Sequence, residues 1–430
     1  MRKFQLLTLS LGLALVTGMC VFADDGDWPQ WRGLHRDAIS PEKNLLKEWP
    51  EKGPPLLWNS AQVNDAKSSL GTAWSSVAIS GGKLFTMGSK DRNCFVSCLD
   101  EATGKLLWET RIDAGADKTH STPTVDGDKV YALSLSGQLV CLNTAKGEVV
   151  WKKDLEKEFK GKRSSYGGYG ESPLIDGDKI LCCPGSESAA MVALKKQTGE
   201  VVWTTAIPGS AEAGHSSIVI AEVGGIKQYV TLMNAKAVGL VGVDAATGKF
   251  LWNYHGAAGG TAQIPTPIVK GDLIFTTSGF SGGSSLVQLV PDAGGIKANE
   301  IYHLPGTTLQ NFQGGVVLVD DKIYGGHGHG EGQPFCLDLK TGKFDWKPVK
   351  GAGKGAAEAI YADGHLYFRY EDNVMALIEA TPTAYKLKSK FQIPGTTADL
   401  DTGFPLPVIA HGRLYLRIKD AVLCYDLRQK

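Results

Sequence analysis

The sequence predicts an all-β protein: a single closed propeller of eight four-stranded antiparallel blades. The first observation is a unit of about 40–50 residues that recurs along the chain, a period typical of propeller blades. The second is the glycine content, 53 of 430 residues, which indicates many tight turns between short strands. The third is an incomplete last unit, matched by a lone strand near the N-terminus. Together they predict a ring whose two ends share one blade.

Each unit contains a short apolar stretch, an Asp-Gly or Gly-Gly turn, two further apolar stretches, and a Thr-Gly turn before a strand that ends in Trp. Clear copies end, in chain order, at Trp108, Trp151, Trp203, Trp252 and Trp346. Degenerate copies span 265–302 and 357–391, and the last copy runs from about Phe404 to Leu427. One such sheet cannot bury both of its faces, so neighbouring sheets have to pack together. We count eight units; a ring of seven or fewer blades is the alternative.

The recurrent Trp is expected to pack between neighbouring blades, where a large flat ring fills the space left by sheet twist. The Asp-Gly and Thr-Gly turns supply the positive φ angles that other residues resist. The last copy lacks its fourth strand, and residues 54–58 (Pro-Pro-Leu-Leu-Trp) resemble the isolated end of a unit. This N-terminal strand is therefore expected to complete the last blade.

The chain divides into three predicted parts: a signal peptide (1–23), a leader that packs on the propeller (24–53) and the propeller itself (54–430). A basic start, an apolar stretch and the sequence Val-Phe-Ala before residue 24 predict cleavage after Ala23 and export to the periplasm or the medium. Lipid attachment at Cys20 and an uncleaved anchor are the alternatives, although Met19 stands where a lipid site favours a small residue. No later segment approaches the length of a membrane span.

The chain has 45 basic and 45 acidic residues, so it offers no broad electrostatic attraction to nucleic acid. Four cysteines occupy the same repeat position and are interpreted as small apolar strand residues: Cys98, Cys141, Cys336 and Cys424. Cys182 and Cys183 are adjacent. Two interpretations stay open for them: a vicinal disulfide, or two ordinary thiols on opposite faces of a strand.

Candidate ligand-binding residues gather on one face of the predicted ring. Connections between blades, and between the second and third strands of a blade, share that face and vary most, as binding loops on a rigid scaffold do. Their polar and aromatic side chains are expected to surround the mouth of the axial channel, a concave place for a ligand. The candidates are Trp74, His120, Arg163, Tyr169, Glu171, His215, Gln263, Gln313, His327, His329 and Glu358.

Each candidate also has a structural interpretation. A single His or Gln before a strand commonly holds its own loop in place. His327 and His329 alternate like two metal ligands, and imidazole suits zinc or copper. Two ligands do not make a site, however, so no metal is predicted.

The unit endings, of the form D-x-x-T-G-K-x-x-W, resemble the pyrroloquinoline-quinone-like repeat family, which includes quinoprotein alcohol dehydrogenases and the barrel-assembly propeller BamB. The resemblance covers about residues 54–430 and implies the fold rather than a reaction. The leader sequence Trp-Pro-Gln-Trp-Arg-Gly (28–33) also looks like exported propellers of planctomycete-type bacteria. In quinoprotein members the quinone lies between a Trp and a vicinal cysteine ring, with Asn, Glu and Asp near calcium. That constellation cannot be mapped here, because Cys182–Cys183 falls inside a strand-like run and Glu171 has no neighbouring Asn.

Three functions follow. The favoured one is a non-catalytic binding or scaffold module, without cofactor and monomeric, that binds an envelope protein or a carbohydrate through its variable face. It fits the absence of G-x-S-x-G, H-E-x-x-H and P-loop patterns. The alternatives are a quinone-dependent alcohol or sugar oxidoreductase with pyrroloquinoline quinone and calcium, and a BamB-like outer-membrane assembly subunit.

Overall fold

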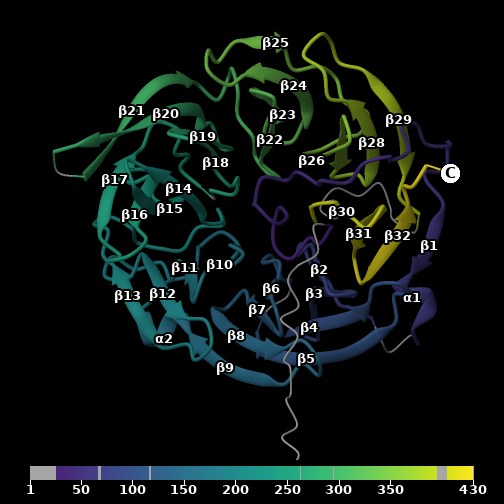
Figure 1. Cartoon of the computed structure of the whole chain (residues 1–430), viewed down its shortest axis with the longest axis horizontal. Helices are drawn as coiled ribbons and strands as arrows, with labels where there is room; N and C mark the ends of the chain where they lie inside the picture. Colours follow the sequence, from purple (N-terminus) through teal and green to yellow (C-terminus); the bar gives the residue numbers. More distant parts are fainter. Residues whose placement is uncertain are drawn as a thin grey trace, which may run out of the picture.

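The computed structural model describes residues 26–65, 69–115, 118–261, 263–293, 295–394 and 404–429. They form eight four-stranded antiparallel sheets arranged as the blades of a ring (Figure 1). The predicted all-β propeller of eight blades is therefore confirmed. The predicted signal peptide, with Cys20 and Ala23, lies outside the described residues.

In every blade the first strand lies nearest the axis and the last strand lies at the rim (Figure 1). Blade 1 contains β2 (Val77–Ser80), β3 (Lys83–Lys90), β4 (Asn93–Asp100) and β5 (Leu106–Ala114). Blade 2 contains β6 (Thr124–Asp126), β7 (Lys129–Leu133), β8 (Gln138–Asn143) and β9 (Val149–Asp154). Blade 3 contains β10 (Leu174–Asp176), β11 (Lys179–Cys182), β12 (Met191–Lys195) and β13 (Val201–Thr205). Blade 4 contains β14 (Val219–Val223), β15 (Ile226–Leu232), β16 (Leu240–Asp244) and β17 (Phe250–Tyr254).

The second half of the ring repeats this order. Blade 5 contains β18 (Ile268–Lys270), β19 (Leu273–Ser278), β20 (Gly283–Asp292) and β21 (Gly295–Leu304). Blade 6 contains β22 (Val316–Val319), β23 (Lys322–His327), β24 (Gln333–Asp338) and β25 (Phe344–Trp346). Blade 7 contains β26 (Ala357–Ala362), β27 (His365–Tyr370), β28 (Val374–Glu379) and β29 (Leu387–Gln392). Blade 8 contains β30 (Val408–Ala410), β31 (Arg413–Ile418), β32 (Ala421–Asp426) and β1 (Leu56–Asn59). Two short helices, α1 (Ser60–Val63) and α2 (Leu155–Phe159), follow β1 and β9.

The ring closes where the two ends of the chain meet in blade 8. Strand β1 pairs antiparallel with β32, and Trp58 lies opposite Cys424 in the register. This pairing gives blade 8 its fourth strand and removes the open edge of β32. The predicted closure by an N-terminal strand is thus confirmed.

Several of the repeated Trp residues join one blade to the next. The indole Nε1 of Trp58 donates to the Glu101 carbonyl (3.2 Å), and that of Trp108 donates to the Thr144 carbonyl (3.1 Å). Equivalent bonds to the following blade are made by Trp151 and Trp346. Three of these rings also cover a glycine in the turn between the third and fourth strands of the next blade. Trp58 covers Gly104, Trp108 covers Gly147, and Trp151 covers Gly199. These glycines have φ of about +71° to +72°, so the turn and the close ring contact both require glycine.

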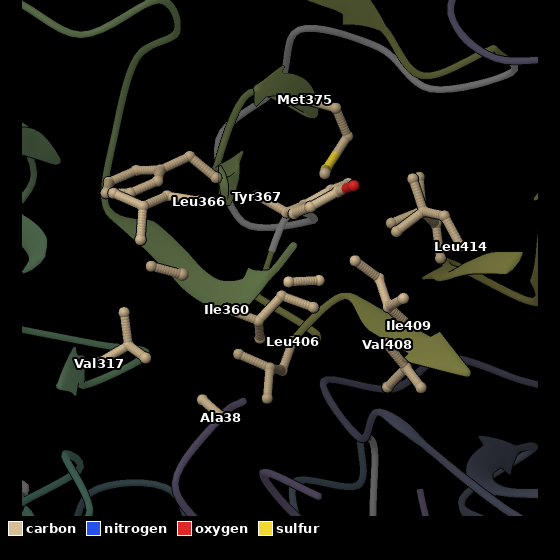
Figure 2. Close-up of a cluster of buried hydrophobic side chains, with 14 of the residues drawn as sticks. Ala38, Val317, Ile360, Leu366, Tyr367, Met375, Leu406, Val408, Ile409 and Leu414 are labelled. Carbon is tan, nitrogen blue, oxygen red and sulfur yellow. The ribbon is translucent and has the colours of Figure 1, made fainter. Parts of the chain in front are cut away.

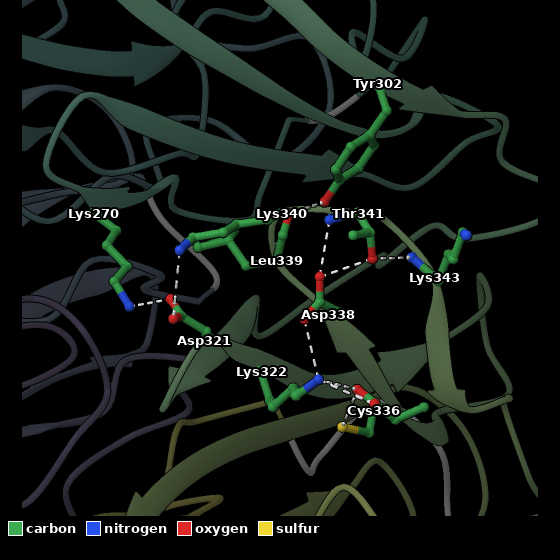
Figure 3. A network of polar contacts seen from close by, with 11 residues as sticks. Lys270, Tyr302, Asp321, Lys322, Cys336, Asp338, Leu339, Lys340, Thr341 and Lys343 are labelled. Atoms are coloured by element: carbon green, nitrogen blue, oxygen red, sulfur yellow. Dashed lines mark hydrogen bonds and ion pairs between the residues drawn. The ribbon is translucent and has the colours of Figure 1, made fainter.

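The Asp of the D-x-x-T-G motif fixes the same turn. One carboxylate oxygen of Asp338 accepts hydrogen bonds from the backbone N–H and the hydroxyl of Thr341, at 2.9 and 2.8 Å (Figure 3). The pairs Asp100–Thr103 and Asp244–Thr247 repeat this arrangement. Figure 3 also shows Tyr302 of blade 5 donating to the Leu339 carbonyl of blade 6. The repeat motif therefore sets both the turn and the contact between blades.

The buried hydrophobic side chains of the described residues form five clusters; each contains residues of at least two blades, and the largest also contains residues of the leader. Figure 2 shows Val317 of blade 6, Ile360 of blade 7 and Ile409 of blade 8 in one cluster of buried side chains. Ala38 of the leader lies at the edge of that cluster and is fully buried.

The leader (26–53) lies across the centre of the ring (Figure 1). Trp28 pairs with Ile79 of blade 1, while the N–H groups of Ser40 and Leu46 donate to carbonyls of blades 7 and 8. The buried guanidinium of Arg36 donates to the carbonyls of Ile218 (2.9 Å) and Ser172 (3.1 Å) in the segments that lead into blades 4 and 3. That of Arg32 donates to Gly314 (3.0 Å) and Val316 (2.6 Å) at blade 6. The leader thus connects blades on opposite sides of the axis.

We predict that Gly147→Ala destabilises the protein by about 2 kcal/mol or more, because an added Cβ meets the Trp108 ring and the residue keeps a positive φ. Gly127→Ala is the matched control: Gly127 has φ +57° and open space around it, so its substitution adds only backbone strain. Urea unfolding of both variants measures the difference. Equal losses in the two variants would show that the Trp contact is not important.

We predict that Trp58→Ala lowers the free energy of unfolding by about 3–5 kcal/mol, the range for removing a buried Trp. Trp58 is 6% exposed and anchors the strand that closes the ring. Leu57→Ala on the same strand is the control, since Leu57 is 43% exposed. If the two variants melt alike, β1 does not hold the ring closed.

Candidate functional site

A cavity of about 530 Å³ lies on the axis, at the face that carries the connections between blades. Six blades line it with the residue four positions before their first strand, namely His120, Gly170, His215, Ile264, Phe312 and Phe404. Blade 1 adds Trp74, and blade 7 adds Glu358 and Glu371. Trp31 of the leader lines the cavity as well. Every blade therefore contributes to one pocket, whose volume suits a small molecule.

A belt of hydroxyl groups fixes these segments at the base of the cavity, where Ser172 and Ser217 also line it. We call Thr122, Ser172, Ser217 and Thr266, each two positions before the first strand of its blade, the hydroxyl belt. The Thr122 N–H donates to the Ser172 hydroxyl (2.9 Å), and the Ser172 N–H donates to the Ser217 hydroxyl (3.0 Å). Trp31 Nε1 donates to the Thr266 hydroxyl (3.0 Å), which ties the leader to the belt. The belt links neighbouring blades and holds the cavity wall in place.

Aromatic rings form much of the wall. Trp74 stacks on His120 with ring centroids 4.5 Å apart, and Phe404 meets Trp74 edge-on at 4.9 Å. Phe312, from the blade opposite His120, packs edge-on against Phe280 at 5.4 Å. Ring surfaces from different blades thus face a common space.

The buried titratable side chains of the wall are uncharged near neutral pH. Burial lowers the pKa of His120 to about 3 and that of His215 to about 4, so both imidazoles are neutral. Burial raises the pKa of Glu358 to about 8, although Arg32 and Arg369 act in the opposite direction. The remaining acid, Glu371, accepts the Ala356 N–H at 3.0 Å. Among the described residues, no Lys or Arg lines the cavity.

Two polar atoms of the wall have no hydrogen-bond partner among the described residues. They are Nδ1 of His215 and Oε2 of Glu358, and both are buried. A buried polar atom without a partner costs free energy, so a ligand that bonds to these atoms would recover it.

Five of the eleven sequence-predicted residues line the cavity together: Trp74, His120, His215, Gln313 and Glu358. Three others are buried beside it and stabilise the fold. The Tyr169 hydroxyl donates to the Pro184 carbonyl (2.8 Å), the Gln263 amide donates to Gly259 and Thr261 of its own loop, and Glu171 accepts the Cys183 N–H.

The last three predicted residues lie elsewhere on this face. Arg163 is exposed and forms a bidentate ion pair with Glu156, at 2.7 and 2.8 Å. His327 Nδ1 accepts the Gln310 N–H at 3.3 Å, and His329 packs on Phe280 and Phe312. Among the residues that the structure describes, no three His, Cys, Asp or Glu side chains group in a way that could hold a metal ion.

Sequence reasoning missed several parts of the wall. Trp31, Phe312, Phe404 and Ile264 line the cavity but were not among the candidates. A usable signal existed in the repeat, because the wall position lies two residues before the Ser or Thr of the belt in His-Ser-Thr, Gly-Glu-Ser, His-Ser-Ser and Ile-Pro-Thr. The contribution of Trp31 from outside the repeats left no such signal.

The adjacent cysteines are both free in the structure and fully or almost fully buried. Cys182 packs with Val192 and Leu194, whereas Cys183 belongs to a separate cluster with Leu181 and Ala193. This arrangement corresponds to two thiols on opposite faces of a strand. The four cysteines at the shared repeat position are buried as well.

A protein-family model described as "Outer membrane protein assembly factor BamB" matches residues 92–348, more than half of the chain. The chain belongs to this BamB family. BamB of Alteromonas naphthalenivorans is 26% identical over 273 residues, which cover 58% of this chain and 60% of that protein. A tetrathionate hydrolase of Acidithiobacillus ferrooxidans is 28% identical over 200 residues, or 42% of this chain and 37% of the enzyme. The match thus spans less than two thirds of either relative.

Solved structures agree on the fold. BamB from Moraxella catarrhalis superposes with a TM-score of 0.57 at 15% identity, covering 83% of this chain and 95% of that one. A europium-containing methanol dehydrogenase gives 0.63 at 13% identity, covering 91% and 89%. Within the described residues, no helix combines the length and apolarity needed to cross a membrane.

The cavity does not fit pyrroloquinoline quinone with calcium, the group that the resemblance to quinoprotein alcohol dehydrogenases suggests. The quinone carries carboxylates that need cationic partners, and calcium prefers anionic oxygen ligands. Lys118 lies 4.5 Å from the centroid of the Trp74 ring but does not line the cavity, and the Glu358 carboxyl keeps its proton at neutral pH. In the part of the chain that the structure describes, the wall therefore offers no cation for the quinone carboxylates and only one further carboxyl group, Glu371, for calcium.

Glu171 makes the stability depend on pH. Burial raises its pKa from 4.5 to about 7, so its stabilising contribution is complete below pH 4.5 and is lost as the pH rises through 7. We predict that Glu171→Gln removes this component, worth about 2–3 kcal/mol, and flattens the decline in unfolding free energy between pH 5 and pH 8. Urea unfolding at both pH values tests it, with the exposed-site variant Glu222→Gln on β14 as control. Parallel declines in Glu171→Gln and the wild type would contradict the assignment.

Proposed function

We propose that this protein is an exported, non-catalytic binding module that holds an uncharged ligand in the axial cavity. The observation that carries the proposal is the wall itself: all eight blades contribute to it, with aromatic surfaces and buried polar groups that are neutral near pH 7. Apolar surface with a few oriented polar groups is typical of small-molecule sites.

The hydroxyls of the wall support a binding role over a catalytic one. Those of Ser172 and Ser217 accept backbone N–H bonds from neighbouring segments, and within the described residues neither is paired with a histidine. Nucleophilic catalysis needs a base that takes the proton of the hydroxyl. These hydroxyls instead fix the geometry of the pocket.

We propose that the protein binds its ligand in the cell envelope. The basic and apolar N-terminal residues favour export, and the family description concerns outer-membrane assembly. We therefore place the protein in the cell envelope, as a monomer, where its ligand is an envelope carbohydrate or a group on an envelope protein.

Titration of the intrinsic tryptophan fluorescence tests the proposal, because Trp31 and Trp74 line the cavity. The panel contains neutral oligosaccharides, neutral nucleosides, and pyrroloquinoline quinone with calcium. We expect a saturable change with at least one neutral compound. His215→Ala should weaken that binding about tenfold, the effect of losing one buried hydrogen bond.

His303→Ala is the matched control, since His303 lies on the outer strand β21, far from the axis in the blade order. It should bind like the wild type. A response to the quinone with calcium alone would favour an oxidoreductase, and no response to any compound would contradict a binding role for the cavity.

A further inference from the structure

We infer that the cavity receives the terminal ring of a neutral carbohydrate chain, with the Glu358 carboxyl and the His215 imidazole binding its polar edge. This inference rests on the proposed function and names its ligand. It comes from three properties of the cavity: a closed inner end, uncharged aromatic walls, and two buried polar atoms without partners.

The inner end is closed by the leader. Trp31 lines the cavity and is held by its bond to Thr266, and the leader on either side crosses the axis. Arg32 and Arg36 bind carbonyls of blades 6 and 4 across the ring. A polymer therefore cannot pass along the axis, and only a chain end can enter.

The walls suit a sugar ring. A pyranose presents C–H faces that pack on aromatic rings, and hydroxyls at its edge that both donate and accept hydrogen bonds. Trp74 and Phe404 supply ring surface on one side and Phe312 on another. Trp74 already stacks on His120, so this pair does not form an open slot between two parallel rings, the site that a planar aromatic ligand needs.

The polar atoms at the wall complement a hydroxyl pair. Nδ1 of neutral His215 and Oε2 of Glu358 have no partner within the described structure and are buried. A protonated Glu358 donates to a sugar oxygen, while the His215 ring nitrogen exchanges a hydrogen bond with a second hydroxyl.

The charged groups around Glu358 do not offer direct contacts to an anion. Arg32 of the leader directs its N–H groups to four backbone carbonyls. Arg369 of β27 donates to the carbonyls of Pro405 and Arg417 and to the Asn373 side chain. The other titratable groups of the wall are His120, which is neutral, Glu371 and Tyr166. A charged sugar would lose its hydration without gaining an ion pair.

The test compares linear and cyclic neutral sugars by fluorescence and calorimetric titration. The probes are maltohexaose, cellohexaose and hexa-N-acetylchitohexaose, α-cyclodextrin as a ring without chain ends, and oligogalacturonide as an anion. We expect at least one neutral linear chain to bind at pH 6, and neither α-cyclodextrin nor oligogalacturonide to do so. Affinity should fall at least tenfold between pH 6 and pH 9.5, because Glu358 then loses its proton.

Glu358→Gln supplies the matched control, since an amide keeps a donor at every pH. It should bind at pH 6 and retain that affinity at pH 9.5. If the affinity of the variant falls with pH as that of the wild type does, Glu358 is not the group that binds the ligand. If the variant does not fold, the pH profile of the wild type and the linear-against-cyclic comparison decide alone.

The remaining outcomes separate the two proposals. Binding of nucleosides but no sugar would overturn the carbohydrate assignment and leave the binding module standing. Equal binding of α-cyclodextrin, or binding of oligogalacturonide, would overturn the inference that the ligand is the end of a neutral chain. Failure of every neutral compound would overturn both.

Discussion

The antiparallel pairing of β1 with β32 is the constraint on which the rest of the structure depends. It joins segments from the two ends of the chain in one sheet and turns a row of repeats into a ring. Only a closed ring brings eight strand starts around one axis, and only then do residues more than 300 positions apart share a wall. The Trp contacts and the D-x-x-T-G turns between blades repeat the same local geometry, so the ring keeps its size.

The leader converts this ring into a cup. A propeller of identical blades has an open channel, whereas here buried arginines hold a segment across it and place Trp31 at the inner end. Arginine suits this task because its planar group donates to several carbonyls at once. Burial then makes the wall unusual electrostatically: imidazoles lose their protons and the Glu358 carboxyl keeps its own. The depth of the cup and its neutrality thus have one origin, the exclusion of water from the axis.

The fold could be predicted from the sequence because a repeat encodes it. Each clear copy of the repeat predicts the same strands and turns and the same position for the Trp. The site could be predicted only in part. Successive residues of an extended segment face opposite sides. Gly170 and Ser172 therefore face the cavity, whereas Tyr169 and Glu171 face away from it. The candidates were chosen as polar residues near strand starts, and the direction of each side chain was not considered. They therefore include residues that hold their own loop, such as Gln263, together with residues of the wall. Trp31 could not be foreseen, because it reaches the wall from outside the repeats through contacts between distant segments.

The position of the leader has a consequence for how the molecule is made. Trp28 to Leu46 are synthesised before any blade, yet Ser40 and Leu46 bind blade 7 and the Leu427 carbonyl, which are made near the end. Trp28 can pair with Ile79 as soon as blade 1 is made, but the segment from Ser40 to Leu46 has to wait for blades 7 and 8, while the middle blades fold by their local contacts. The cup is completed only in the final step, since a nascent chain stalled before the last blade lacks Phe404 of the wall and the carbonyl that holds Leu46.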